Sequence, residues 1–280
     1  MTNTEKTSVK VAIIDLYNGH FNQGMRCFQN ILDKYRTQNQ LDLSYQVFDL
    51  RGNNQIPNLD FDIYISSGGP GSPLDSKGSV WENLYFELIE NIQNHNNSDH
   101  PQKKHVLFVC HSFQLMCRHY GLGTVNQRHS PSFGILPVHQ TENAQTDAVF
   151  AGLPEPFYAV DSRSWQVINP DAERFTAIGA TILAIEKERP HLNWERCIMA
   201  VRFNEYFIGT QFHPEADPEG MRLRLLEPEK KQETIAEHGE RKYEEMLERL
   251  DDPDMLLLTQ NTMIPNFLDQ ALLTFQEASI

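Results

Sequence analysis

His105–Tyr120 reads HVLFVCHSFQLMCRHY, and this stretch decides the class of fold. Its first part, HVLFVC, is a short apolar run that predicts a buried strand. Its second part, from Phe113 to Tyr120, is an apolar segment that ends at Gly121, which predicts a helix. Cys110 therefore closes a strand and opens a helix, and α/β folds present a nucleophile at such a turn.

The same alternation of strand and helix surrounds this stretch. A continuous apolar run from Val9 to Leu16 has the pattern of a strand buried on both faces of a parallel sheet. Chains that alternate in this way form doubly wound α/β sheets, so we expect a mostly parallel sheet. Further strands are predicted at Leu43–Leu50, Phe61–Ser67, Phe133–His139, Phe157–Val160, Ala177–Ile185, Cys197–Phe203 and Tyr206–Phe212, with helices at Met25–Tyr35 and Ser79–Ile92.

The composition changes after Glu219, where the chain becomes rich in charged residues. We therefore divide it into an α/β domain over residues 1–218 and a helical C-terminal extension over residues 219–280. Glu227–Leu250 predicts an amphipathic helix, and Ile264–Phe275 predicts a final docked helix that begins near Pro265. We expect the extension to lie outside the α/β core and to pack on it or on a partner.

Bulk properties exclude several classes of protein. The formal net charge of −14 argues against a nucleic-acid or anionic-membrane surface, because phosphates bind to basic patches. No apolar run approaches about 18 residues, so no membrane-spanning helix is predicted. Met1–Lys10 has no signal-peptide pattern and the four cysteines include no CxxC pair, so we expect a cytoplasmic protein. The histidines lack the spacing of metal ligands, and we expect no metal and no cofactor.

Cys110 has candidate chemical partners far downstream. Ile208–Asp217 reads IGTQFHPEAD, so His213 and Glu215 stand two residues apart at the end of a predicted strand. Extended backbone puts such a pair on one side. A histidine can take a thiol proton and return it to a leaving group, while a carboxylate behind it fixes the ring. A lone cysteine or a lone His-x-Glu is commonly structural, but together they predict an acyl-transfer site.

Three motifs stand in the order and at the separations of one known family. SSGGPGSP at Ser66–Pro73, CHSFQ at Cys110–Gln114 and QFHPE at Gln211–Glu215 resemble the motifs of class I glutamine amidotransferases. The chain is most similar to the glutaminase domain of GMP synthetase and to its stand-alone relatives. This resemblance covers Val9 to Pro218 and implies the family's α/β fold with a nucleophile elbow.

The resemblance also implies roles for individual residues. The family's nucleophile falls on Cys110, its general base on His213 and its orienting carboxylate on Glu215. Glycine has a physical advantage in this site, because an oxyanion needs N–H donors that approach closely. The oxyanion-hole amides of the family fall on Gly69 and His111, and its substrate-binding positions on Gly68, Gln114, Ser162 and Arg163.

The chain departs from the family pattern at the elbow and at one substrate-binding position. Phe108 and Ser112 stand where the family usually has glycine, two residues before and after the cysteine. A bulky Phe108 beneath the strand predicts a displaced elbow and low glutaminase activity in the isolated chain, unless a partner completes the site. Arg163 replaces the usual histidine. Its guanidinium clamps a substrate carboxylate, or it lies at the surface and its backbone binds substrate; we favour the backbone.

The predicted reaction is hydrolysis of the side-chain amide of glutamine through a γ-glutamyl thioester on Cys110. The family passes the ammonia to a synthetase domain, but this sequence has no phosphate-binding loop or nucleotide-binding signature. The acceptor then sits on another chain, or the protein is a stand-alone hydrolase. The partner that we expect is a synthetase subunit or a second copy of this chain in a homodimer. Two alternatives stay open: an acyltransferase of the homoserine acyltransferase type, with Arg163 holding a carboxylate, and a catalytically weak binding module.

Overall fold

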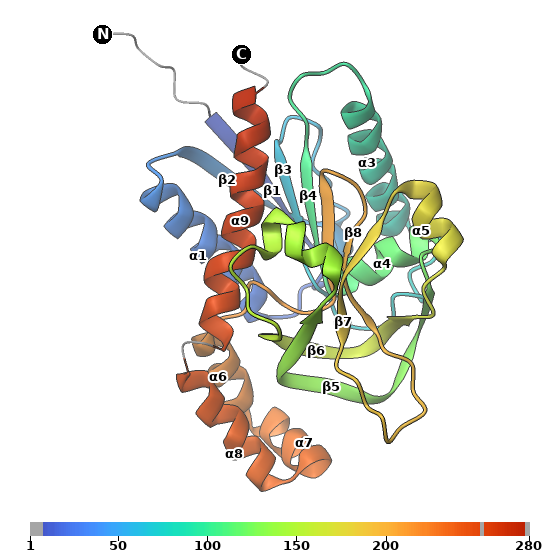
Figure 1. Cartoon of the computed structure of the whole chain (residues 1–280). Coiled ribbons are helices and arrows are strands. Elements are labelled where there is room, and N and C mark those ends of the chain that lie inside the picture. The colour runs from blue at the N-terminus through green and yellow to red at the C-terminus, as the bar shows by residue number, and fades with distance from the viewer. Residues whose placement is uncertain (1–7, 253–254, 278–280) are drawn as a thin grey trace.

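The computed structural model describes residues 8–252 and 255–277, and within them one nine-stranded sheet runs in the order β2-β1-β3-β4-β9-β8-β7-β5-β6 (Figure 1). The α/β fold class is confirmed, although the sheet is parallel only in the half that carries β4. The parallel strands are β1 (Ser8–Asp15), β2 (Asp42–Asp49), β3 (Ile63–Ser66), β4 (His105–Val109) and β9 (Phe207–Thr210). The antiparallel half adds β5 (Thr124–Gln140), β6 (Phe157–Ile168), β7 (Thr181–Glu186) and β8 (Ile198–Arg202).

Helices cover both faces of the parallel strands (Figure 1). α1 (Gln23–Gln38) and α9 (Leu256–Glu277) pack on one face, and α3 (Val80–Asn97) and α4 (His111–Tyr120) pack on the other. Alternate residues of a strand serve the two faces: Ile13 of β1 packs with α1, whereas Ile14 packs with α3. The remaining helices are α2 (Leu50–Asn53), α5 (Ala172–Ile178), α6 (Pro218–Leu226), α7 (Pro228–His238), α8 (Glu240–Glu248) and the short 3-10 helices η1 (Glu142–Thr146), η2 (Ala148–Phe150) and η3 (Arg249–Asp251).

The C-terminal extension is helical, but its helices differ from those predicted. The predicted helix over Glu227–Leu250 is broken at Gly239, whose φ of 84° lies in the left-handed region that favours glycine. The last helix begins at Leu256 and holds Pro265 inside it, so the predicted start near Pro265 is wrong. No helix of the described residues is long and apolar enough to cross a membrane.

The extension also divides between two hydrophobic clusters. α9 contributes Phe267, Leu268 and Ala271 to the same cluster as β1 and α1, so the prediction that the whole extension lies outside the core is wrong for α9. α6 and α8 pack instead on β5 and β6, through a second cluster that includes Phe133 and Val160. This placement sets α6–α8 beside β5 and β6 (Figure 1).

Candidate active site

Cys110 sits in a strained turn between β4 and α4. Its φ of 52° and ψ of −97° are unusual for a residue with a side chain. The turn is held by its own backbone, because the N–H of Cys110 donates to the carbonyl of Thr210 at 2.7 Å. The hydroxyl of Ser112 accepts from the N–H of Val109 at 2.8 Å and lies 2.9 Å from the carbonyl of Ser66. Ser112 thus ties the elbow to the end of β3.

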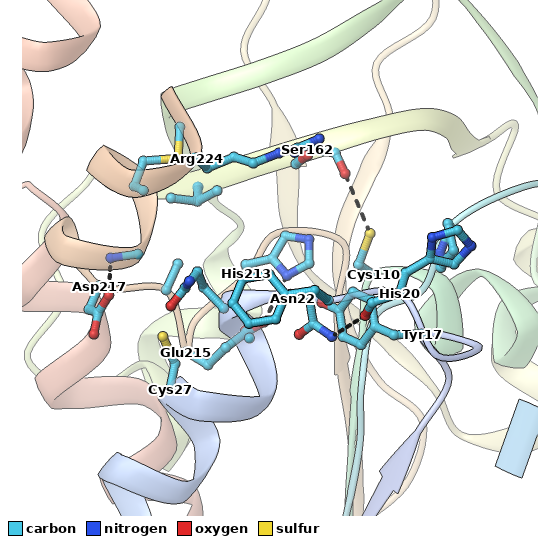
Figure 2. Close-up of a pocket in the computed structure, with 18 of the residues that line it drawn as sticks. Tyr17, His20, Asn22, Cys27, Cys110, Ser162, His213, Glu215, Asp217 and Arg224 are labelled. Carbon is cyan, nitrogen blue, oxygen red and sulfur yellow. Dashed lines mark hydrogen bonds and ion pairs between the residues drawn. The ribbon is translucent and has the colours of Figure 1, made fainter. Parts of the chain in front are cut away.

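The structure brings Cys110, His213 and Glu215 together. Figure 2 shows the ring of His213 between the other two side chains. Nδ1 of His213 donates to Oε1 of Glu215 at 2.8 Å, and the ring makes a hydrogen bond with Cys110. The carboxylate is 1% exposed, so water does not weaken its interaction with the ring. A Cβ on Gly68 would lie 3.0 Å from Cε1 of His213 and 3.5 Å from Cβ of Cys110, so this glycine lies against both.

The charges around His213 favour its protonated form. Burial alone would lower the pKa of His213, but the negative charges of Glu215 and of the Cys110 thiolate, and hydrogen bonds with both, raise it well above its usual value. A protonated ring beside the sulfur can give its proton to a leaving group.

Gly69 and His111, the candidate oxyanion-hole residues, both lie near Cys110. His111 is the first residue of α4, where backbone N–H groups have no partner within the helix. Gly69 lies so close to β1 that a Cβ would stand 2.5 Å from the carbonyl oxygen of Leu16. Arg51 fixes this loop, because its Nη1 donates to the carbonyls of Pro70 and Leu16. The side chain of His111 is buried, and burial with the nearby arginine charges lowers its pKa to about 3, which keeps the ring neutral.

Gln114 and Gln211 form a buried amide pair behind the sulfur. Nε2 of Gln114 donates to Oε1 of Gln211 at 3.1 Å and to the carbonyl of Trp165 at 3.2 Å. Nε2 of Gln211 in turn lies 3.7 Å from Sγ of Cys110. The predicted substrate-binding Gln114 is therefore joined to the nucleophile through Gln211.

Ser162 and Arg163 have very different environments. The carbonyl of Ser162 lies 3.9 Å from Sγ of Cys110, whereas the side chain of Ser162 is exposed (Figure 2). The guanidinium of Arg163 is buried and bound to Asp161 at 2.7 Å and to Glu186 at 3.4 Å. The expectation that the Arg163 side chain lies at the surface is therefore wrong, and the guanidinium already has carboxylate partners within the protein.

Cys110 lies where two cavities meet. A cavity of about 430 Å³ on the side of α1 and α6 has Tyr17, His213 and Glu215 in its wall (Figure 2). A second cavity, of about 400 Å³, is lined by residues of the elbow, β5 and β6, and by Lys230 of α7. The two share Gly69, Pro70, Cys110, Phe133 and Ser162. A reactant at the sulfur can therefore extend in two directions.

In the described parts of the chain, no group of three or more histidine, cysteine or carboxylate side chains could hold a metal ion.

Three residues of the site were missed by sequence reasoning. Tyr17 lies near the triad, with its hydroxyl 3.2 Å from a Cβ position on Gly68. Arg51 braces the glycine loop, and Lys230 enters the second cavity from the extension. Tyr17 follows the first predicted strand, where ligand-facing residues gather in open sheets, and this was its one available signal.

Comparison with known proteins shows the family of this chain. The model of the family "Glutamine amidotransferase class-I" matches residues 22–231, which is most of the chain. The chain therefore belongs to the class I glutamine amidotransferase family. No protein with curated annotation matches it.

Solved structures with the same fold share little sequence with this chain. The protein SMU.1228c is 21% identical, with a TM-score of 0.64 over 94% of this chain and 100% of that one. A glutamine amidotransferase from Thermotoga maritima is 16% identical, with a TM-score of 0.64 over 95% of this chain and 99% of that one. A protein from Thermoplasma acidophilum that is assigned as a GMP synthase subunit is 14% identical, with a TM-score of 0.57 over 98% and 99%. At these identities the likeness shows the fold.

Proposed function

We infer that the chain hydrolyses the side-chain amide of glutamine at Cys110 and releases ammonia for an acceptor on another chain. The observation that carries this proposal is the hydrogen-bonded series from Cys110 through His213 to Glu215 at a strand–helix elbow. Family membership supports it, because class I members are typically glutamine-hydrolysing enzymes.

The residues support a two-step acyl transfer. The sulfur of Cys110 attacks the amide carbon, and the N–H groups of Gly69 and His111 stabilise the oxyanion that forms. The C–N bond breaks as His213 gives its proton to the leaving nitrogen, so ammonia departs and a γ-glutamyl thioester remains. His213 then takes a proton from water, and the hydroxide attacks the thioester. The C–S bond breaks and glutamate leaves.

The acceptor for ammonia belongs to a partner in this proposal. One structural neighbour is assigned as a GMP synthase subunit, which supports a second chain that completes the synthase. The cavity on the side of α1 and α6 begins at the same sulfur, so it offers departing ammonia a route away from the elbow. A synthetase chain is therefore the partner that we propose first, ahead of a homodimer.

The acyltransferase alternative loses its main support. It required the guanidinium of Arg163 to hold an amino-acid carboxylate, but that group already binds Asp161 and Glu186. Its side chain is 1% exposed, so a substrate would have to displace a buried ion pair, which costs several kcal/mol.

The proposal is tested by incubating the purified chain with L-glutamine and measuring glutamate and ammonia. Wild type should release both, and Cys110→Ala should release neither while keeping its circular dichroism spectrum. Cys117→Ala is the matched control, because Cys117 lies on the same helix but is buried in the core.

A glutamine-analogue diazoketone should alkylate Cys110 in mass spectra of the wild-type protein. Equal turnover by wild type and Cys110→Ala would refute the proposed function. An acyl adduct from an acyl-thioester donor, with no reaction with the glutamine analogue, would favour the acyltransferase.

A further inference from the structure

The C-terminal extension provides part of the wall around Cys110. Lys230 and Glu233 of α7 line the cavity of about 400 Å³ that also holds Cys110 and Gln114. Figure 1 shows α7 in the group of helices next to β5 and β6. The motifs that define the family in this sequence end at Glu215, so the resemblance assigns these two side chains no role.

Lys230 is held in a fixed place. Its Nζ lies 4.1 Å from the centroid of the Phe133 ring and 2.8 Å from Oε2 of Glu233. The side chain of Lys230 is 12% exposed, whereas that of Glu233 is 50% exposed. An ammonium group ordered in this way loses little conformational freedom when a ligand binds.

A short series of contacts joins Lys230 to the nucleophile. Phe133 on β5 pairs with Ser162 on β6, and the carbonyl of Ser162 lies 3.9 Å from Sγ of Cys110. The ammonium group is therefore separated from the sulfur by one aromatic ring and one strand pair. Cys110 and Lys230 also line the same cavity, so a glutamine whose amide reaches Cys110 lies in a cavity that Lys230 borders.

The charge of this cavity depends on the same two residues. Arg163 also lines it, but Asp161 and Glu186 bind its guanidinium. Among the described residues of the lining, Lys230 and Glu233 are the charged side chains that have no ion-pair partner beyond each other. They present a positive and a negative group side by side, which complements the adjacent carboxylate and ammonium of a free amino acid.

We propose that Lys230 binds the α-carboxylate and Glu233 the α-ammonium of the substrate, so that the extension selects free amino acids. This rests on the proposed function, because it places the scissile amide at Cys110. The extension then belongs to the substrate site as well as to the fold.

Binding to a Cys110→Ala chain tests the proposal without turnover. Isothermal titration should give a Kd for L-glutamine that rises about tenfold or more when Lys230→Met or Glu233→Gln is added, because each removes a charge-assisted hydrogen bond. Methionine keeps the unbranched stem on Phe133 while removing the charge. Lys231→Met and Glu229→Gln are matched controls on exposed positions of the same helix, and they should leave the Kd unchanged.

Glutamine analogues that lack one of the two charged groups show which side chain binds which group. The affinity for L-glutaminamide, which lacks the α-carboxylate, should not change with Lys230→Met. The affinity for 4-carbamoylbutanoate, which lacks the α-ammonium, should not change with Glu233→Gln. Melting curves of all variants confirm that each remains folded.

The outcomes separate this proposal from the proposed function. Equal glutamine affinity in all variants, with glutamine turnover by wild type, would overturn the roles of Lys230 and Glu233 alone. Failure of the Cys110→Ala chain to bind glutamine, with no turnover by wild type, would overturn both proposals.

Discussion

Phe108 and Gly209 lie opposite each other in the parallel pair of β4 and β9, and the glycine leaves the room that the phenylalanine occupies. A Cβ at position 209 would stand 3.3 Å from Cβ of Phe108 and 2.9 Å from Cδ2 of Phe113. The ring of Phe108 packs edge-on against Phe203 and Phe207, at centroid distances of 5.7 and 5.9 Å. The structure thus removes the reason to expect that Phe108 tilts the elbow.

Phe108→Gly should therefore destabilise the chain without increasing glutamine turnover. Loss of a fully buried phenylalanine leaves a cavity and costs about 3–5 kcal/mol of unfolding free energy. Urea denaturation and the kcat for glutamine measure the two effects. Ser112→Gly is the companion variant, since it removes the hydroxyl that ties the elbow to β3. Faster turnover by Phe108→Gly would restore the idea of a displaced elbow, and partner gating would then be unnecessary.

Glu215→Gln should shift the high-pH limb of kcat/KM to lower pH. The charge of Glu215 favours the protonated ring, so its removal lowers the pKa of His213 toward or below the usual 6.5. Because the imidazolium supplies the proton for the leaving nitrogen, activity is lost as pH rises through this pKa. Asp217→Asn is the control, since Asp217 pairs with Arg26. An unshifted limb in Glu215→Gln would mean that Glu215 does not set the charge of His213.

Glu186 should make the fold sensitive to acid. Burial alone would raise its pKa, but a hydrogen bond from Arg189 and the charges of Arg163 and Arg128 lower it to about 2 from 4.5. Because the pKa of Glu186 is lower in the folded chain than in the unfolded chain, its charged form stabilises the fold at pH values above 4.5. This contribution to the unfolding free energy, on the order of 3 kcal/mol, is lost as pH falls toward 2.

Urea denaturation at neutral pH and near pH 3 measures this loss. The difference in unfolding free energy between wild type and Glu186→Gln should be smaller at the acidic pH. Glu188→Gln is the control, because Glu188 is exposed. A difference that stays constant with pH would show that Glu186 is not the source.

Phe267→Ala should destabilise the whole fold, although it lies in the C-terminal extension. Phe267 is fully buried in the cluster that includes β1 and α1, so about 3–5 kcal/mol is expected from thermal or urea unfolding. Leu273→Ala, on the same helix but 59% exposed, should change stability by less than about 0.5 kcal/mol. Removal of all residues after Glu219 should for the same reason cost the chain its solubility. A soluble, folded truncation would refute the role of α9 in the core.

The elements around Cys110 could be predicted because local sequence determines them. The apolar run of β4 and the spacing of His213 and Glu215 contain enough information to place the site. The ends of β5 could not be predicted, because its first part is polar and exposed and the pairing shifts between Gln127 and Ser132.

Other features depend on contacts between distant parts of the chain. One ion pair of Arg163 on β6 requires Glu186 from β7, which lies on the far side of β5 in the sheet, and no local pattern reveals this. The part of α9 before Pro265 was not predicted because proline is usually found at the start of a helix and not inside it, yet here packing on the sheet outweighs that preference. The position of Lys230 likewise follows from how α7 packs against β5.

The left-handed φ of Cys110 strains the backbone at the residue that supplies the reactive sulfur. Glycine would adopt this backbone freely, whereas cysteine holds it at a cost of order 1–3 kcal/mol. Cys110→Gly would therefore relieve the backbone strain at this turn, but it would also remove the nucleophile and abolish activity. Substitutions chosen to raise thermal stability by relieving backbone strain would therefore replace Cys110, the nucleophile, among the first. Thermostability has to be sought elsewhere in the sheet.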